Sequence, residues 1–432
     1  MSGLVLKARR LTPARIIIFG FLALILFGAL LLTLPVSTRD GLGASFEDAL
    51  FTATSATCVT GLVVQDTYTY WSPFGQAVVL ALIQIGGMGV VTMALAIFTI
   101  TGRRIGLKQR VVMQETVSAP HVGGMVRLVG FIVRGTLLVE GAGAVVLALR
   151  FCPQFGFGKG LWFAVFHSVS AFCNAGFDLM GESGAFSSLV HYSADPLVNI
   201  AIMALITIGG IGFFVWDDLL QNGLHFRRYR LQTKLVLVTS GLLIVLPAAY
   251  LYFVEFSHPQ WAGLSAGERV LAALFQSVTT RTAGFNTIDQ TALSGPALML
   301  CTLTMLVGGS PGSTAGGFKT TSLAVLVLCV ASVLRHTATL VTLYAGLFLA
   351  GAMAICEWDG VPLSAALYET ASAIATVGLT VGITPGLGLA SHLVLVFLMY
   401  FGRVGGLTLL YAVAGAHPAP HGTLPEEKVN VG

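Results

Sequence analysis

Four short strings of small and hydroxyl-bearing residues, each ending in a glycine, are the parts of this sequence best suited to chemistry. The last reads Thr376-Val377-Gly378, and the backbone carbonyls of a Thr-Val-Gly loop can replace the hydration shell of a potassium ion. The Tyr-Gly that usually follows is replaced by Leu379-Thr380. The tripeptide alone means little, because it occurs by chance in apolar chains. Its weight comes from three comparable strings elsewhere in the sequence.

Each string follows a short segment of helical character that opens on an aromatic residue, so the chain carries four copies of one unit. Three copies share Ser-Ala six and five residues before the glycine, and the third copy is one residue shorter. The four segments run from Phe51 to Gly61, from Phe166 to Gly176, from Phe275 to Gly284 and from Tyr368 to Gly378.

A helix this short cannot cross a bilayer, so each unit is expected to dip into the membrane and return, with its irregular backbone facing protein or water. Four such loops around one axis would stack rings of carbonyl oxygens along a pore, with the negative helix C-termini aimed at the cation. Glycine in each loop permits the backbone angles that turn carbonyls inward. The repeats therefore predict a pseudo-symmetric pore built by one chain.

The composition is that of an integral membrane protein. Of 432 residues, 55% are hydrophobic and 10% are charged, which is more apolar surface than a soluble domain can bury. Apolar runs of about 20 residues predict membrane-spanning helices, and eight are present: 16–34, 76–100, 128–149, 196–216, 235–254, 297–334 (interrupted), 340–356 and 391–414. The expected fold is all-α and polytopic, with eight transmembrane helices and four re-entrant pore helices around one central pore.

Charge placement orients the chain in the membrane. Lys and Arg cluster before the first apolar run, after the second (103–127) and after the fourth (227–234), which puts these segments on one side. An excess of Lys and Arg marks the cytoplasmic side, so both termini are expected in the cytoplasm. The other side carries more acids, among them Asp66 and Asp178, and would offer a cation a mildly negative mouth.

Glycines recur in the apolar helix that follows each loop. They are Gly86, Gly87 and Gly89; Gly209, Gly210 and Gly212; Gly308 and Gly309; and Gly402, Gly405 and Gly406. Glycine is unfavourable in a helix interior, so this recurrence predicts close packing or a kink beneath each loop. Ordinary packing between membrane helices explains any single pair equally well.

The stretch Gly308–Lys319 interrupts the sixth apolar run with a cluster of Gly, Ser, Thr and Pro. Proline and clustered glycines break a helix, and irregular backbone at mid-bilayer depth must line a cavity. A phosphate-binding Walker loop does not fit, because Phe318 separates the last glycine from Lys319. A cytoplasmic turn between two short helices stays an alternative.

Arg403 and Glu140 are the charged residues inside apolar runs that bear most on function. Arg403 lies in the last run, where a buried arginine is costly, marks a functional site by default and repels a permeant cation. Glu140 is the main carboxylate within a span, and pairing with a neighbouring helix is favoured over proton transport. The six cysteines and nine histidines are dispersed, so K+ is the only metal ion expected.

Together, the spans, the four loops and the interrupted sixth run resemble the Trk/Ktr/HKT superfamily of potassium transporters, and within it the bacterial KtrB type. The resemblance covers residues 15–415 and is most specific at 172–178, 279–287 and 309–320. It implies that the filter carbonyls belong to Val59, Thr60, Gly61, Asn174, Ala175, Gly176, Thr282, Ala283, Gly284, Thr376, Val377 and Gly378.

In this family the interrupted stretch is an intramembrane loop that obstructs the pore below the filter. The implied gate residues are Gly308, Gly309, Gly312, Ser313, Thr314, Gly316, Gly317, Lys319 and Arg403. Arg403 would face the loop as an electrostatic barrier, and a structural role, satisfying orphan carbonyls of the broken helix, stays open. Lys319 is expected to snorkel or to cap a helix end. The family usually has a longer connection than residues 335–339.

The expected domains follow the repeats. They are a cytoplasmic N-terminus (1–15), repeat 1 (16–100), a linker (101–127), repeat 2 (128–216), a linker (217–234), repeat 3 (235–334, with loop 308–319), repeat 4 (335–414) and a cytoplasmic tail (415–432). The resemblance implies a homodimer in the bacterial inner membrane and a cytosolic KtrA-type (RCK) ring that binds ATP or ADP. Stimulation of transport by sodium is also known in this family, but no residue in this sequence explains it. This chain is expected to hold no cofactor and to bind no nucleic acid.

The predicted function is potassium uptake down the electrochemical gradient, without enzymatic activity. A Na+- or H+-coupled symporter is the main alternative, but it would need carboxylates inside the spans, where Glu140 is the main one. An intramembrane enzyme would need clustered nucleophiles, bases or metal ligands, whereas the polar residues here gather at the glycine loops.

Overall fold

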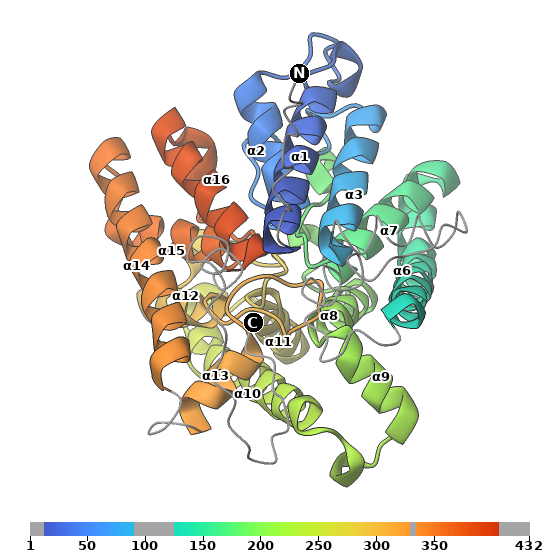
Figure 1. Cartoon of the computed structure of the whole chain (residues 1–432). Coiled ribbons are helices and arrows are strands. Elements are labelled where there is room, and N and C mark those ends of the chain that lie inside the picture. Colours follow the sequence, from blue (N-terminus) through green and yellow to red (C-terminus); the bar gives the residue numbers. More distant parts are fainter. Residues whose placement is uncertain (1–12, 90–124, 329–333, 406–432) are drawn as a thin grey trace, which may run out of the picture.

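The computed structural model describes residues 13–89, 125–328 and 334–405, and every regular element within them is a helix. Figure 1 shows the helices in four groups that follow one another in chain order around a central set of loops. The predicted segment 415–432, most of 1–15 and nearly all of 101–127 lie outside the described residues.

Each group contains a long helix, a short helix, a loop and a closing helix. The long helices are α1 (Pro13–Leu32), α6 (Met125–Phe155), α10 (Leu231–Phe253) and α14 (Leu334–Asp359). The short helices are α2 (Phe46–Thr57), α7 (Phe157–Phe172), α11 (Ala266–Thr279) and α15 (Leu363–Ile374). The closing helices are α3 (Pro73–Met88), α8 (Pro196–Gly210), α12 (Gly295–Met305) and α16 (Leu389–Val404), while α9 (Phe213–Asn222) follows α8 and α13 (Thr320–Leu328) follows α12.

The helix lengths bear on the predicted spans. Within the described residues, four helices are long and apolar enough to cross a membrane, at Arg15–Leu32, Arg127–Phe155, Leu231–Ser257 and Val341–Asp359. A fifth arises if α8 and α9, which are bent by 96° at their junction, count as one span. The predicted runs 76–100 and 391–414 continue beyond the described residues, and the predicted linker 217–234 begins inside α9. The chain is thus an all-helical membrane protein.

The sequence determines where the short helices begin, and their length limits how far they can extend across a bilayer. Ser45 caps α2 by accepting from the N–H of Asp48, and Ser265 and Glu268 form a capping box on α11. The four short helices have 12 to 16 residues. At 1.5 Å per residue they are about 18–24 Å long, less than a bilayer core of about 30 Å. Their aromatic residues anchor them, being 1% exposed or less: Phe51, Phe166, Phe275 and Tyr368.

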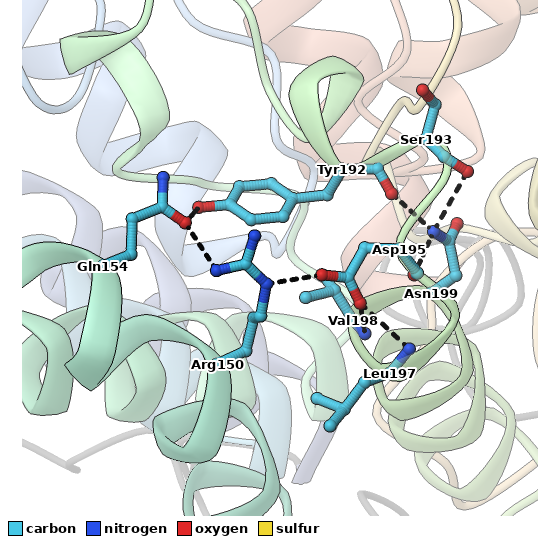
Figure 2. Close-up of polar contacts among 8 residues, drawn as sticks. All are labelled: Arg150, Gln154, Tyr192, Ser193, Asp195, Leu197, Val198 and Asn199. Atoms are coloured by element: carbon cyan, nitrogen blue, oxygen red, sulfur yellow. Dashed lines mark hydrogen bonds and ion pairs between the residues drawn. The ribbon is translucent and has the colours of Figure 1, made fainter.

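A polar cluster on α6 fixes the start of α8 (Figure 2). Arg150 Nε donates to Asp195 Oδ2 at 2.6 Å, and Arg150 Nη1 donates to Gln154 at 3.0 Å. The other carboxylate oxygen of Asp195 caps α8 by accepting from the N–H groups of Leu197 and Val198, at 3.0 and 3.2 Å. These bonds hold the closing helix of the second group against its long helix.

A candidate carbonyl ring and the loop that crosses it

The four loop glycines contact one another in a closed cycle. A Cβ atom built on each glycine would lie 2.1–2.7 Å from the carbonyl oxygen that precedes the next glycine: Gly61 with Ala175, Gly176 with Ala283, Gly284 with Val377, and Gly378 with Thr60. Such distances leave no room for a side chain, which explains the glycine in every copy. The structure therefore brings together all four strings that the sequence singled out.

The four loops also share one backbone conformation. The glycine and the non-glycine residue two positions before it both have positive φ, and the residue between them does not: 56° and 91° (Val59, Gly61), 57° and 72° (Asn174, Gly176), 65° and 78° (Thr282, Gly284), 54° and 87° (Thr376, Gly378). Side chains make such angles rare, and strained residues of this kind cluster at functional sites.

The loop amides are paired within the protein, whereas the loop carbonyls are not. The residue before each glycine donates its backbone N–H to a carbonyl near the end of its own short helix, at 2.7–3.0 Å. The pairs are Thr60 to Ser55, Ala175 to Ser170, Ala283 to Thr279 and Val377 to Ser372. In the described part of the chain, no backbone N–H donates to the carbonyls of the residues one and two positions before the glycines, which are 1% exposed or less. Buried carbonyls without donors suit a partner of positive charge.

The recurring glycines of the closing helices allow both close packing and a change of helix direction, the two effects predicted for them. A Cβ on the first glycine would lie 2.0 Å from the last carbonyl of the preceding short helix: Gly86 with Thr57, Gly209 with Phe172, and Gly402 with Ile374. Three residues later a glycine with φ of 84–97° ends or bends the helix: Gly89, Gly212 and Gly405. The third group differs, because Gly308 contacts Gly316 of its own interruption instead.

Residues 306–319, which we name the crossing loop, run between α12 and α13. They lie against two of the four glycine-ended strings, which we call the filter strings. Thr314 Oγ1 donates to the Phe172 carbonyl at 2.9 Å and lies 3.3 Å from Asn174 Oδ1. A Cβ on Gly316 would lie 2.1 Å from Thr376 Oγ1. The crossing loop thus spans from the second string to the fourth, which disfavours a turn remote from the loops.

The remaining predicted gate residues shape this loop. The N–H groups of Gly308 and Gly309 donate to the carbonyls of Phe318 at 2.8 Å and Gly316 at 3.2 Å, which closes the loop on itself. Gly312 and Gly317 have positive φ, 66° and 72°. Ser313 Oγ is buried without a hydrogen-bond partner within the described residues.

Arg403 joins the crossing loop to the first group of helices. Its Nη1 donates to the Thr314 carbonyl, and its Nη2 donates to the carbonyls of Gly86 and, at 2.9 Å, Gly87. The two glycines belong to the last turn of α3, where helix carbonyls lack intrahelical partners. Arg403 therefore faces the loop and donates to carbonyls at the end of α3 rather than to those of the broken α12; the Gly86 carbonyl also accepts from the N–H of Gly89 at 3.1 Å.

The prediction that Lys319 snorkels or caps a helix end is wrong. Its Nζ donates to the Ala315 carbonyl at 2.9 Å, inside the crossing loop, so the ammonium group is bonded within the protein instead of reaching the membrane surface or a helix end. Glu140 meets its prediction, since Gln84 of α3 donates to it at 3.2 Å and so links α6 to α3. Sequence reasoning missed Glu369, a carboxylate on α15 that is 0% exposed and had a detectable signal: it directly follows the aromatic residue of its repeat.

The architecture and the site define a class: a polytopic helical membrane protein in which four glycine loops of one chain converge on a ring of unpaired carbonyls. The family model for TrkH, described as a cation transport protein, matches residues 12–342 and 339–422. The chain belongs to this family, within the Trk/Ktr superfamily and close to the KtrB subunits. It is accordingly a transport protein rather than an enzyme.

Individual relatives agree with this assignment. The Ktr system potassium uptake protein B of Bacillus subtilis is 38% identical, with 95% of each chain covered. The potassium/sodium uptake protein NtpJ of Enterococcus hirae is 36% identical, with 98% of each chain covered. The crystal structure of the potassium transporter TrkH from Vibrio parahaemolyticus matches with a TM-score of 0.68 over 94% of this chain and 86% of that one; at 22% identity it supports the fold alone.

Proposed function

We propose that this chain carries potassium into the bacterial cell through a pore lined by the four filter strings. The observation that carries the proposal is the closed cycle of four glycine loops with one shared backbone conformation and unpaired carbonyls. Rings of backbone carbonyls replace the hydration shell of a monovalent cation without a side-chain charge. The ion-coordinating oxygens are those of the twelve filter residues named from the sequence.

The finer architecture belongs to the same proposal. Four pseudo-symmetric units surround one pore, the long and closing helices supply eight spans, and the four short helices are re-entrant. The fourfold order of long helix, short helix, loop and closing helix supports this arrangement. The protein sits in the plasma membrane with both termini cytoplasmic, which the placement of Lys and Arg supports.

The crossing loop and Arg403 form the gate. The loop lies against the second and fourth filter strings, so an ion leaving the ring on that side meets it. The guanidinium places a positive charge beside the loop and bonds it to α3, so the gate combines a steric obstacle with an electrostatic one.

The partners follow from relatives named as components of a Ktr system. The proposed assembly is a homodimer whose cytoplasmic face docks a KtrA-type ring that binds ATP or ADP. Basic residues Arg227, Arg228 and Arg230, between α9 and α10, support a docking face of positive charge.

Sodium-coupled transport is the second candidate, and the relative named for potassium and sodium uptake favours it. Reversal potentials in proteoliposomes separate the two, because an uncoupled potassium pore gives potentials that track the potassium gradient alone. A potential that shifts with the sodium gradient at fixed potassium would support coupling.

The test of the proposed function is growth rescue at low external potassium in cells that lack their own uptake systems. The chain is expected to restore growth, and Gly378→Ser is expected to relax selectivity toward sodium while the protein still reaches the membrane. Failure of the unaltered chain to rescue, alone and with a KtrA-type partner, would contradict the proposal.

A further inference from the structure

Each short helix carries one polar residue directly after its aromatic anchor, and this residue differs from repeat to repeat. The four residues are Thr52, His167, Gln276 and Glu369. All four are buried, with 1% of their surface exposed or less. A buried polar group lowers stability unless it is hydrogen-bonded. His167, Gln276 and Glu369 have hydrogen-bond partners, whereas Thr52 Oγ1 has none among the described residues.

The second and third of these residues reach the segment that leaves their own filter string. His167 Nε2 accepts from the N–H of Leu179 at 3.3 Å, three residues after the filter glycine. Its Nδ1 lies 2.7 Å from the Phe163 carbonyl, which requires the proton on Nδ1 and leaves Nε2 as an acceptor. Gln276 bonds Gln290, six residues after the filter glycine, at 2.7 Å. The position thus connects the short helix to the outgoing chain.

Glu369 makes the most extensive connection of the four. Its Oε1 accepts from the Thr380 hydroxyl and from the N–H of Val381, the latter at 3.0 Å, and its Oε2 accepts from the Thr384 hydroxyl at 2.8 Å. These donors stand two, three and six residues after Gly378, so one carboxylate gathers the whole outgoing segment of the fourth string.

The same network continues to the first repeat. His392 on α16 donates from Nε2 to the Thr384 carbonyl at 2.9 Å, and its Nδ1 lies 2.9 Å from Glu47 in the first turn of α2. The fourth string also contacts the first, because Gly378 lies against Thr60. Glu369 therefore stands where the cycle of four repeats closes.

We propose that Glu369 is a positioning residue that holds the outgoing segment of the fourth filter string, and that this hold sets the preference of the pore for potassium over sodium. The inference rests on the proposed function. Leu379 and Thr380 stand where a channel signature has Tyr-Gly, and the Thr380 hydroxyl bonds Glu369 instead. A carbonyl ring that can contract accepts the smaller sodium ion, so the buried carboxylate acts through the backbone without touching the ion.

The test compares Glu369→Leu with Glu369→Gln in proteoliposomes, with 86Rb+ and 22Na+ uptake and reversal potentials as readouts. Leucine leaves three donors without an acceptor, and the potassium-over-sodium preference is expected to fall roughly tenfold, with a higher KM for potassium and a maximal cation flux within about twofold of the unaltered protein. Glutamine keeps an oxygen for Val381 and an amide for Thr384, so it is expected to retain the preference within about twofold.

Thr52→Val is the matched control. It alters the same position in the first repeat, where Thr52 Oγ1 is buried without a hydrogen-bond partner among the described residues, and it is expected to leave the preference unchanged. The double change Thr380→Val with Thr384→Val keeps the carboxylate and removes two of its donors. It is expected to lower the preference roughly threefold, and it decides the matter if Glu369→Leu does not accumulate in the membrane.

An unchanged preference in folded Glu369→Leu, or in the double variant where that protein is absent, overturns the inference. The same assay on the unaltered chain separates this outcome from failure of the proposed function. If the unaltered chain and Glu369→Leu show the same preference for potassium, only the role of Glu369 is contradicted. An unaltered chain without any potassium preference contradicts the filter itself.

Discussion

The filter strings and the crossing loop are both irregular backbone buried among apolar helices, yet their hydrogen bonds to other repeats differ. Each filter string is bonded to the end of its own short helix, for example Thr60 to Ser55 at 2.8 Å. The crossing loop is bonded within itself, through Gly308 and Gly309, and also to other repeats. Thr314 donates to the carbonyls of Phe172 and Gly209, and Arg403 on α16 donates to the loop. Local bonds keep a conformation fixed, whereas bonds between repeats can be broken together when the repeats shift. The strings should therefore set which ion passes, and the crossing loop how fast.

The largest effect is expected from Gly378→Ser. A Cβ there would lie 2.1 Å from the Thr60 carbonyl oxygen, so the first and fourth strings must separate. The preference for potassium over sodium is expected to fall roughly tenfold or more, since about 1.4 kcal/mol of differential binding corresponds to tenfold. Competition between 86Rb+ and 22Na+ for uptake measures it.

Gly360→Ser is the control for this prediction. Gly360 also has positive φ, 64°, but a Cβ there would have nothing within 4 Å. This change also places a side chain at positive φ, but it crowds no neighbour, so selectivity is expected to stay unchanged. Equal loss of selectivity in both variants would show that strain, rather than contact between strings, is responsible.

Deletion of residues 312–316 tests the role of the crossing loop. It removes Thr314 and Gly316, which contact the second and fourth strings. Potassium flux is expected to rise about tenfold while the potassium-over-sodium preference stays within about twofold, because the local bonds of the strings are untouched. Flux that is unchanged or lost in a folded variant, or altered selectivity, would erase the distinction between the two regions.

Substitutions of Arg403 can separate the effect of its charge on the gate from the effect of its hydrogen bonds. Arg403→Ala is expected to raise flux several-fold, about threefold to tenfold, by removing both the charge and the link to Thr314 and Gly87. Arg403→Lys keeps the charge, but an ammonium cannot bond three carbonyls with the planar fork of a guanidinium. We expect lysine to raise flux less than alanine does, because it keeps the positive charge and loses only the bonds. Flux at the level of the unaltered protein in Arg403→Lys would make the barrier purely electrostatic.

Much of this comparison could be predicted from the sequence, and the reason is physical. Gly61 and its three counterparts are needed because a side chain has no room there, so the repeat is visible in residue types. The partners of the crossing loop could not be predicted. Arg403 bonds carbonyls of Gly86 and Gly87, more than 300 positions away, and any residue type supplies a carbonyl. The 96° bend after α8 also came from the structure, since its glycines allowed either packing or a kink.

The smallest effect is expected from the cluster in Figure 2, whose hydrogen bonds involve no residue of the filter strings or of the crossing loop. Asp195→Ala removes the cap of α8 and the bond to Arg150 at 2.6 Å. It should lower the free energy of unfolding by about 1 kcal/mol, seen as a lower Tm in detergent, with ion selectivity unchanged. Arg150→Ala leaves the cap in place and should cost less. A change of selectivity in either variant would mean that the filter is not held locally.

The most direct test of the account is a structure determined with Rb+ or Tl+ in place of potassium, using anomalous scattering to locate the ion. We expect density inside the cycle of Gly61, Gly176, Gly284 and Gly378, with the carbonyl oxygens of Thr60, Ala175, Ala283 and Val377 as its ligands. Ions bound instead by carboxylates away from this cycle, with the ring empty at saturating ion concentration, would contradict the claim that backbone carbonyls of four unequal loops select the ion.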